Sequence, residues 1–218
     1  MICGSGGKRT NRQLDAWTGR FGDEYTERNV VDWSTRLPLF QEMLKGLRLR
    51  RILEVGCNRG HNLLALSRLA GEDARVVGIE PNSRARALAR ALNPGAPVLA
   101  GESYHLPFHD SVFDLVLTWG VLIHVPLAKL PTALAEIWRV AARHILAVEY
   151  FAEAETTIQY RGHNDLLWKR DFLQHYKTQF PGLGLLRKGY WGEKEHEDRV
   201  SWWLLERSSS GHLDPASR

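Results

Sequence analysis

The residues best suited to chemistry lie in a glycine-containing stretch about a quarter of the way along the chain. Glu54, Gly56 and Gly60 follow the pattern Glu-x-Gly-x-x-x-Gly, at the end of an apolar run over 52–55. Glycine allows a backbone to pass close to a ligand or to adopt a positive φ. In open α/β sheets, ligands bind at the carboxyl ends of the strands. The spacing therefore predicts a cofactor-binding loop between a buried strand and a helix.

The loop suits a nucleoside better than a dinucleotide. A dinucleotide fingerprint uses three glycines so that a pyrophosphate can approach the helix, but Asn58 and His61 occupy the second and third of these positions. The next apolar run, over 76–79, ends at Glu80. A carboxylate there can accept two hydrogen bonds from a ribose diol. The pair predicts a nucleoside ligand without phosphates.

These features resemble the class I S-adenosylmethionine-dependent methyltransferases. The first motif of that family reads acidic-x-Gly-x-Gly-x-Gly, with a glycine where Asn58 stands, and its second strand ends in an acid. Gly101-Glu102-Ser103, just before Leu106-Pro107-Phe108, matches the family's adenine contact. The run over 111–118, which continues into Trp119-Gly120, resembles its fourth strand. A glycine turn in some other α/β protein is the alternative.

The resemblance implies that S-adenosylmethionine is the cofactor and S-adenosylhomocysteine the product. It places cofactor contacts at Tyr25, Glu54, Gly56, Cys57, Asn58, Gly60, Asn62, Glu80, Pro81, Glu102, Ser103, Thr118, Trp119 and Gly120.

Further stretches resemble the methylases associated with pseudaminic acid biosynthesis, a bacterial subgroup of this class. They cover 21–29, 118–125, 148–150 and 160–172. The chain differs from the subgroup at Trp119, where lysine is expected, and 151–159 has no counterpart. Both differences flank the substrate side. The resemblance therefore supports the predicted fold and cofactor more strongly than it supports a predicted substrate.

Methyl transfer from a sulfonium requires chiefly that a nucleophile be held in line, at about 3 Å. A base is needed only if the nucleophile arrives protonated. Candidate catalytic residues are His124, Glu149, Tyr160 and His163. His124 follows the fourth strand, and the ordinary pKa of a histidine suits proton removal near neutral pH. A packing or capping role is the alternative.

The other candidates also have structural alternatives. Glu149 ends the fifth strand and could instead form a salt bridge to Arg161 or Arg170. Tyr160 and His163 could instead lock their loop together with Asp165.

Substrate contacts are expected at Trp17, Tyr150, Arg161 and Asp165. Acidic and aromatic side chains favour a cationic amine or guanidine, whereas Arg161, Lys169 and Arg170 favour a carboxylate or phosphate. A free amino acid has both kinds of group, and a nucleotide-linked amino sugar would use the second set more. We therefore expect methylation at N or O of a small soluble metabolite in bacterial sugar or natural-product biosynthesis.

Two other activities remain open. The chain could bind S-adenosylmethionine as a non-catalytic or regulatory protein. It could also consume the aminobutyryl part of the cofactor, because the same alignment serves each carbon on the sulfonium.

Composition sets the broad class. The 218 residues are 44% hydrophobic and 25% charged, which fits one globular domain. No apolar run approaches the roughly 20 residues that a membrane helix needs, and 1–10 lacks the apolar core of a signal peptide. We therefore expect a cytoplasmic protein with no membrane partner, acting as a monomer or homodimer.

Other ligand classes are disfavoured. The net charge is +4, but the basic clusters are short, as at 45–51, so a nucleic-acid substrate is not expected. Cys3 and Cys57 offer no disulfide framework, and the nine histidines form no ligand array, so no metal is expected.

Alternation of strands and helices predicts an α/β fold. We expect a Rossmann-like, seven-stranded sheet of the class I methyltransferase type, with an N-terminal helical cap. The predicted strands are 52–55, 76–79, 97–100, 111–118, 144–150, 185–191 and 200–205, and the predicted helices are 37–47, 61–70, 82–92, 130–143 and 170–180. The domain would span 11–207, with a cap over 11–48, a core over 49–207, a substrate loop over 151–169 and flexible ends at 1–10 and 208–218.

Overall fold

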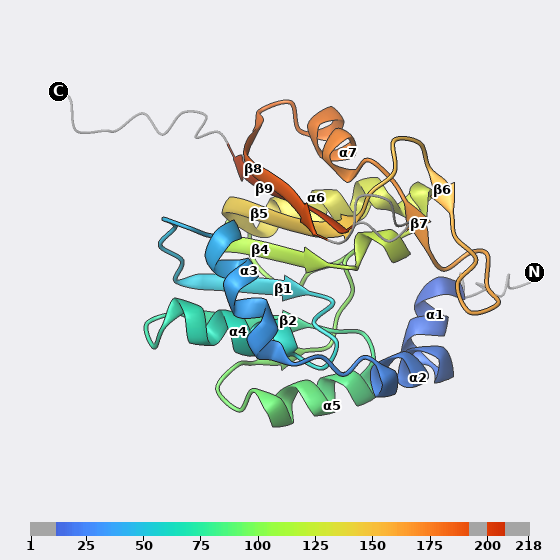
Figure 1. Cartoon of the computed structure of the whole chain (residues 1–218), viewed down its shortest axis with the longest axis horizontal. Helices are drawn as coiled ribbons and strands as arrows, with labels where there is room; N and C mark the ends of the chain where they lie inside the picture. Colours follow the sequence, from blue (N-terminus) through green and yellow to red (C-terminus); the bar gives the residue numbers. More distant parts are fainter. Residues whose placement is uncertain (1–11, 192–199, 208–218) are drawn as a thin grey trace, which may run out of the picture.

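The computed structural model describes residues 12–191 and 200–207. Its centre is a seven-stranded sheet with the strand order β3-β2-β1-β4-β5-β9-β8 (Figure 1). The first five strands in this order pair in parallel, whereas β9 is antiparallel to both β5 and β8. The predicted seven-stranded α/β sheet is therefore confirmed. The ends at 1–10 and 208–218, predicted to be flexible, lie outside the described residues.

The strands of the main sheet lie close to the predicted runs. They are β1 Arg51–Val55, β2 Arg75–Ile79, β3 Val98–Leu99, β4 Phe113–Trp119, β5 Ala141–Tyr150, β8 Leu183–Trp191 and β9 Val200–Arg207. A separate two-stranded sheet pairs β6 Thr156–Thr157 with β7 Trp168–Lys169, within the segment predicted to contact substrate.

Helices precede the sheet and connect its strands. They are α1 Arg12–Thr18, α2 Arg20–Arg28, α3 Arg36–Met43, α4 His61–Ala70, α5 Ser83–Leu92, α6 Leu130–Val140 and α7 Phe172–Gln179. Short 3₁₀ helices lie at η1 Trp33–Thr35, η2 Leu122–His124 and η3 Leu127–Lys129.

Apolar side chains cover both faces of the central strands, which explains their continuous apolar runs. Ile52 and Leu115 belong to the core shared with α3 and α4, while Leu53 and Val116 belong to the core shared with α6 and α7. Neighbouring residues of a strand point to opposite faces, so each strand contributes to two cores.

The boundary between α6 and β5 differs from the prediction. The helix predicted over 130–143 ends at Val140, and 141–143 belong to the strand. Ala141 pairs with Phe113 of β4, and its extended backbone ends the helix. A pairing partner far away in sequence therefore overrides the local helical preference.

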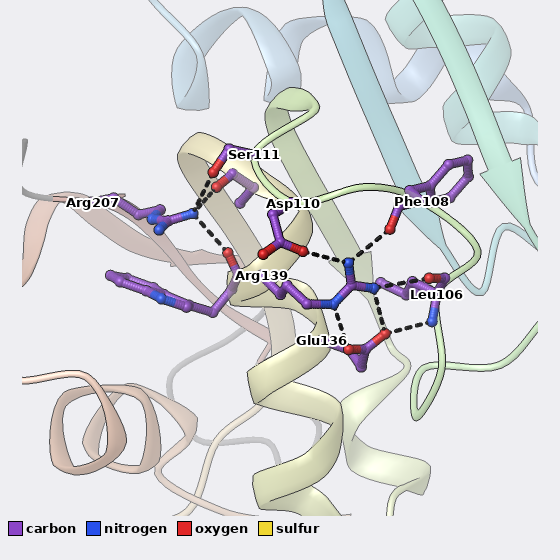
Figure 2. Close-up of polar contacts among 9 residues, drawn as sticks. Leu106, Phe108, Asp110, Ser111, Glu136, Arg139 and Arg207 are labelled. Carbon is purple, nitrogen blue, oxygen red and sulfur yellow. Dashed lines mark hydrogen bonds and ion pairs between the residues drawn. The ribbon is translucent and has the colours of Figure 1, made fainter.

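An arginine on α6 fastens the loop that connects β3 to β4 (Figure 2). The guanidinium of Arg139 donates hydrogen bonds to Glu136 at 2.7 Å and to Asp110 at 2.9 Å. It also donates to the carbonyl oxygens of Phe108 and Leu106, at 2.7 and 2.9 Å. Glu136 in turn accepts the Leu106 N–H at 2.7 Å. Because charge-assisted bonds are strong, this network fixes the loop against the helix.

We expect Arg139→Gln to lower the free energy of unfolding by about 1–3 kcal/mol, since several acceptors of charge-assisted bonds lose their donor. Chemical denaturation monitored by circular dichroism measures the change. The matched control is Arg143→Gln, whose side chain is 66% exposed and lies 3.6 Å from Glu206. Equal effects of the two substitutions would contradict the fastening role of Arg139.

Candidate functional site

A cavity of about 400 Å³ lies at the carboxyl ends of β1, β2 and β4. This volume is within the range of small-molecule sites. In Figure 1, α1 and α2 lie at the end of the sheet toward which the arrows of β1 and β4 point, whereas α3 lies over one face of the sheet. Residues of α1 and α2 contribute to the lining, together with the loops that follow the strands.

The loop after β1 requires special backbone conformations. Gly56 and Gly60 have φ values of 75° and 78°. An added Cβ would lie 2.5 Å from Val121 at the first glycine, and 2.5 Å from Asn93 at the second. Asn58 also has a positive φ, 42°. Asparagine tolerates this left-handed region better than most residues, which explains how it can replace the glycine usual at this position.

Glu80 joins two of the loops that line the cavity. Its carboxylate accepts hydrogen bonds from the backbone N–H groups of Asn58 at 2.9 Å and Asn82 at 2.8 Å. Burial raises the pKa of this carboxyl, while the two bonds oppose the shift. Each carboxylate oxygen keeps a further lone pair, so the group can still accept bonds from a ligand diol.

An acidic and a basic side chain line the cavity with unused polar atoms. Glu54 is buried, and its Oε1 accepts a hydrogen bond from Asn62 at 2.8 Å, but its Oε2 has no partner. Arg36 lies over the ring of Trp119, 4.2 Å from the centroid, and its buried Nε has no partner. A ligand with both an ammonium and a carboxylate would satisfy both atoms. Burial raises the pKa of Glu54 to about 8.

The loop after β3 supplies another unused acceptor. Glu102 and Ser103 line the cavity, and the buried Oε2 of Glu102 has no partner in the protein. Buried polar groups normally have hydrogen-bond partners, so this oxygen indicates a ligand donor.

The hydrogen bonding of His124 fixes its tautomer. Its Nδ1 lies 2.6 Å from the carbonyl oxygen of Leu166. A carbonyl can only accept, so Nδ1 carries the hydrogen and Nε2 keeps its lone pair. Burial lowers the pKa of the ring to about 4, so the side chain is neutral at pH 7. The ring packs against Trp17, with 4.3 Å between centroids.

Glu149 supports the turn that carries His124. Its carboxylate accepts the backbone N–H groups of Val121 and Ile123, both at 3.3 Å. Burial raises its pKa to about 7. The salt bridge considered with Arg170 is not formed, because that guanidinium pairs with Glu155 at 2.5 Å.

The polar segment after β6 contributes less to the cavity than the sequence predicts. Tyr160 lines it, whereas Arg161 and His163 are exposed and do not. Tyr160 and His163 exchange backbone hydrogen bonds of 2.7 and 3.0 Å, and both rings contact Phe21. Asp165 is half-buried and also lies outside the lining.

Most of the predicted site residues meet at this cavity. Those in its lining are Trp17, Tyr25, Glu54, Gly56, Cys57, Asn58, Asn62, Glu80, Pro81, Glu102, Ser103, Trp119, Gly120, His124, Glu149, Tyr150 and Tyr160. Those outside it are Gly60, Thr118, Arg161, His163 and Asp165. Burial raises the pKa of the Cys57 thiol, which disfavours a nucleophilic role for this residue.

Several lining residues were not predicted from the sequence, notably Gln13, Arg36, Arg59 and His61. Gln13 and Arg36 come from helices before the sheet, where no motif distinguishes them. Arg59 and His61 belong to the predicted loop and could have been found from its spacing.

Within 12–191 and 200–207, no three His, Cys, Asp or Glu side chains are grouped so that they could hold a metal ion. None of the helices in this part of the chain has the length and apolarity to cross a membrane.

Comparison by sequence finds a match to a family over the first part of the sheet. The family described as "Methyltransferase domain" matches residues 52–144. An uncharacterized protein of Haemophilus influenzae is 30% identical over 95 residues, which are 42% of this chain and 38% of that protein. The chain thus spans well under half the length of this relative.

Solved structures share the architecture over most of the chain. The PH0226 protein of Pyrococcus horikoshii has a TM-score of 0.65 at 16% identity, covering 93% of this chain and all of that one. Magnesium protoporphyrin IX methyltransferase of Synechocystis, with bound S-adenosylhomocysteine, has a TM-score of 0.66 at 14% identity, covering 89% and 98%. The fold is that of the Rossmann-like methyltransferases. The [4+2]-cyclase SpnF shares this methyltransferase fold, with a TM-score of 0.61 at 16% identity over 79% of this chain and 80% of that one.

Burial of Glu54 makes stability depend on pH. Its pKa in the folded chain, about 8, exceeds the ordinary value of 4.5, so the folded state holds a proton that the unfolded state releases. The stabilisation that comes from this tighter proton binding is fully present below pH 4.5 and is lost as pH rises to about 8. We expect Glu54→Gln to gain stability relative to the wild type across this range, by at most about 1.4 kcal/mol per pH unit.

Thermal unfolding of the ligand-free protein between pH 5 and 9 measures this difference. The control is Glu42→Gln, because Glu42 is exposed on α3. A Glu54→Gln curve parallel to that of the wild type would show that Glu54 is already ionised in the folded protein.

Proposed function

We propose that this chain is an S-adenosylmethionine-dependent methyltransferase that transfers a methyl group to N or O of a small molecule, with S-adenosylhomocysteine as the product. The observation that carries the proposal is a pair of buried polar atoms without partners, Glu54 Oε2 and Arg36 Nε, in one cavity. They suit the ammonium and carboxylate of a methionyl group. An ordinary nucleotide has no such zwitterionic end.

The remaining parts of the cofactor have matching groups along the same edge of the sheet. Glu80 has lone pairs for the ribose hydroxyls, and Glu102 has an unused oxygen for the adenine amino group. The bound cofactor would supply a methyl group on a sulfonium, which is already a good leaving group. The tasks left to the protein are to orient the acceptor, to exclude water and to take up a proton where the acceptor has one.

The comparisons support the same activity. The methyltransferase family matches 52–144, which includes the loops that carry Glu54, Glu80 and Glu102. One fold neighbour is named as a methyltransferase with bound S-adenosylhomocysteine. Another is named as a [4+2]-cyclase, so the fold alone does not select methyl transfer. The proposal therefore depends on the chemistry of the cavity and must be tested by following the methyl group.

For the acceptor, the sequence suggested amino sugars, nucleotide sugars or amino acids of bacterial sugar or natural-product biosynthesis. The cationic side chains expected to bind the carboxylate or phosphate of such an acceptor give these acceptors little support. Arg161 is exposed outside the cavity, and Arg170 is buried and paired with Glu155. An acceptor without a strong negative charge fits the lining better.

Titration calorimetry with S-adenosylmethionine and S-adenosylhomocysteine tests the cofactor site. We expect Glu80→Ala and Arg36→Met each to weaken binding by about 10- to 100-fold, because each removes charge-assisted bonds from a buried site. The control Glu72→Ala changes an exposed residue between α4 and β2 and should bind as the wild type does. Absence of binding to the wild type, or unchanged binding by both site variants, would refute the cofactor assignment.

Product analysis separates methyl transfer from the other activities that the sequence leaves open. A methylated acceptor with S-adenosylhomocysteine supports the proposal. Release of methylthioadenosine would identify consumption of the aminobutyryl group, and binding without any product from a broad acceptor set would favour a regulatory role.

A further inference from the structure

One end of the cavity has polar groups that the cofactor assignment leaves unused. Gln13 and Trp17 lie one helical turn apart on α1, so they share a face, and both line the cavity. Gln13 is 7% exposed, yet its amide nitrogen and oxygen are both buried without a partner. The indole Nε1 of Trp17 is also buried without a partner. Leaving such groups unsatisfied is costly, so they indicate a ligand.

The walls around these groups are aromatic. The ring of His124 lies 4.3 Å from that of Trp17 and 6.0 Å from that of Tyr160, measured between centroids. Phe21 lies outside the lining and supports it by packing against the rings of Trp17 and Tyr160, at 5.2 and 5.9 Å. Leu167 adds an apolar side chain to the lining. Walls of this kind favour a flat, apolar body, with a few polar groups to orient it.

Charged side chains in the lining have other roles. Arg36, Glu54, Glu80 and Glu102 face the proposed cofactor, while Glu149 and Arg59 are engaged by backbone groups. His124 is neutral and can accept a hydrogen bond through Nε2. A protonated amine would meet no free carboxylate beside this ring, whereas a hydroxyl would meet an acceptor for its proton.

We propose that the methyl acceptor binds between α1 and the turn after β4, and that it is an uncharged, ring-shaped hydroxyl compound with a donor–acceptor edge that Gln13 recognises. This inference rests on the proposed methyltransferase function. The edge would be a cyclic amide or a similar pair of adjacent N–H and C=O groups, because the Gln13 amide presents one donor and one acceptor side by side. Gln13 is thereby a specificity-determining residue.

The reaction balances with the residues at this end of the cavity. The hydroxyl oxygen forms the new bond to the methyl carbon as the carbon–sulfur bond breaks, and the sulfur keeps the electron pair. The hydroxyl proton passes to Nε2 of His124. The imidazolium then releases this proton to solvent, which restores the neutral ring. Glu149 acts as a positioning residue, since it holds the turn on which His124 lies.

Three matched ring probes test the proposal: 7-hydroxyquinolin-2-one, 7-hydroxycoumarin and 2-naphthol. The first has the complete amide edge, the second lacks the N–H and the third lacks the edge. Binding to the protein saturated with S-adenosylhomocysteine is measured by calorimetry, and methylation with S-adenosylmethionine by mass spectrometry. We expect affinity to fall in that order, by about tenfold from the first probe to the last.

Two variants assign the effect to named residues. Gln13→Leu should remove the preference for the quinolinone and leave S-adenosylhomocysteine binding unchanged, while the control Gln41→Leu, at an exposed position on α3, should keep both. His124→Phe should lower kcat by about 100-fold with little change in cofactor binding.

The outcomes distinguish this inference from the function on which it rests. If S-adenosylhomocysteine binds but L-arginine or UDP-N-acetylglucosamine is methylated in preference to all three ring probes, the acceptor class is wrong. An unchanged probe preference in Gln13→Leu would remove the role of Gln13. If S-adenosylhomocysteine does not bind to the wild type, the proposed function fails and this inference fails with it.

Discussion

Parallel pairing of β1 with β2 and β4 determines where the polar groups of the cavity lie. The register aligns Val55 with Ile79 and with Thr118, so the segments that follow these strands emerge together at one edge of the sheet. Gly78 on β2 leaves room for the loop after β1, because an added Cβ at this position would lie 2.7 Å from the sulfur of Cys57. A slip of one residue would reverse the faces of a whole strand and carry Glu54 away from the cavity.

Burial of several carboxylates at this edge is the main electrostatic cost of the site. Glu54, Glu80 and Glu149 are all buried, and burial raises the pKa of each. Backbone N–H groups offset part of this cost at Glu80 and Glu149, whereas Glu54 keeps an oxygen without a partner. The carboxylates that hold the loops, Glu80 and Glu149, thus have hydrogen-bond partners in the protein. Glu54, which suits a cationic ligand group, keeps one oxygen without a partner.

The N-terminal helices have two different roles. Helix α3 packs its Phe40 and Met43 into the core and presents Arg36 to the cavity. Helices α1 and α2 instead close the end of the sheet, where Asn82 donates hydrogen bonds to the Trp17 carbonyl and to Asp23. These bonds connect the helices to the loop that carries Glu80. The proposed acceptor end of the cavity therefore depends on the same loop as the proposed ribose site.

The sequence by itself determined the sheet, the loop after β1 and the acids at 54, 80 and 102, because apolar periodicity and glycine spacing are local properties. It also set the place of His124 after the fourth strand. Only the tertiary structure decided that His124 carries its hydrogen on Nδ1, that Glu149 supports a turn, and that Arg161 and His163 lie outside the cavity. It alone identified Gln13 and Arg36, since a buried atom without a partner is defined by contacts between residues far apart in the chain.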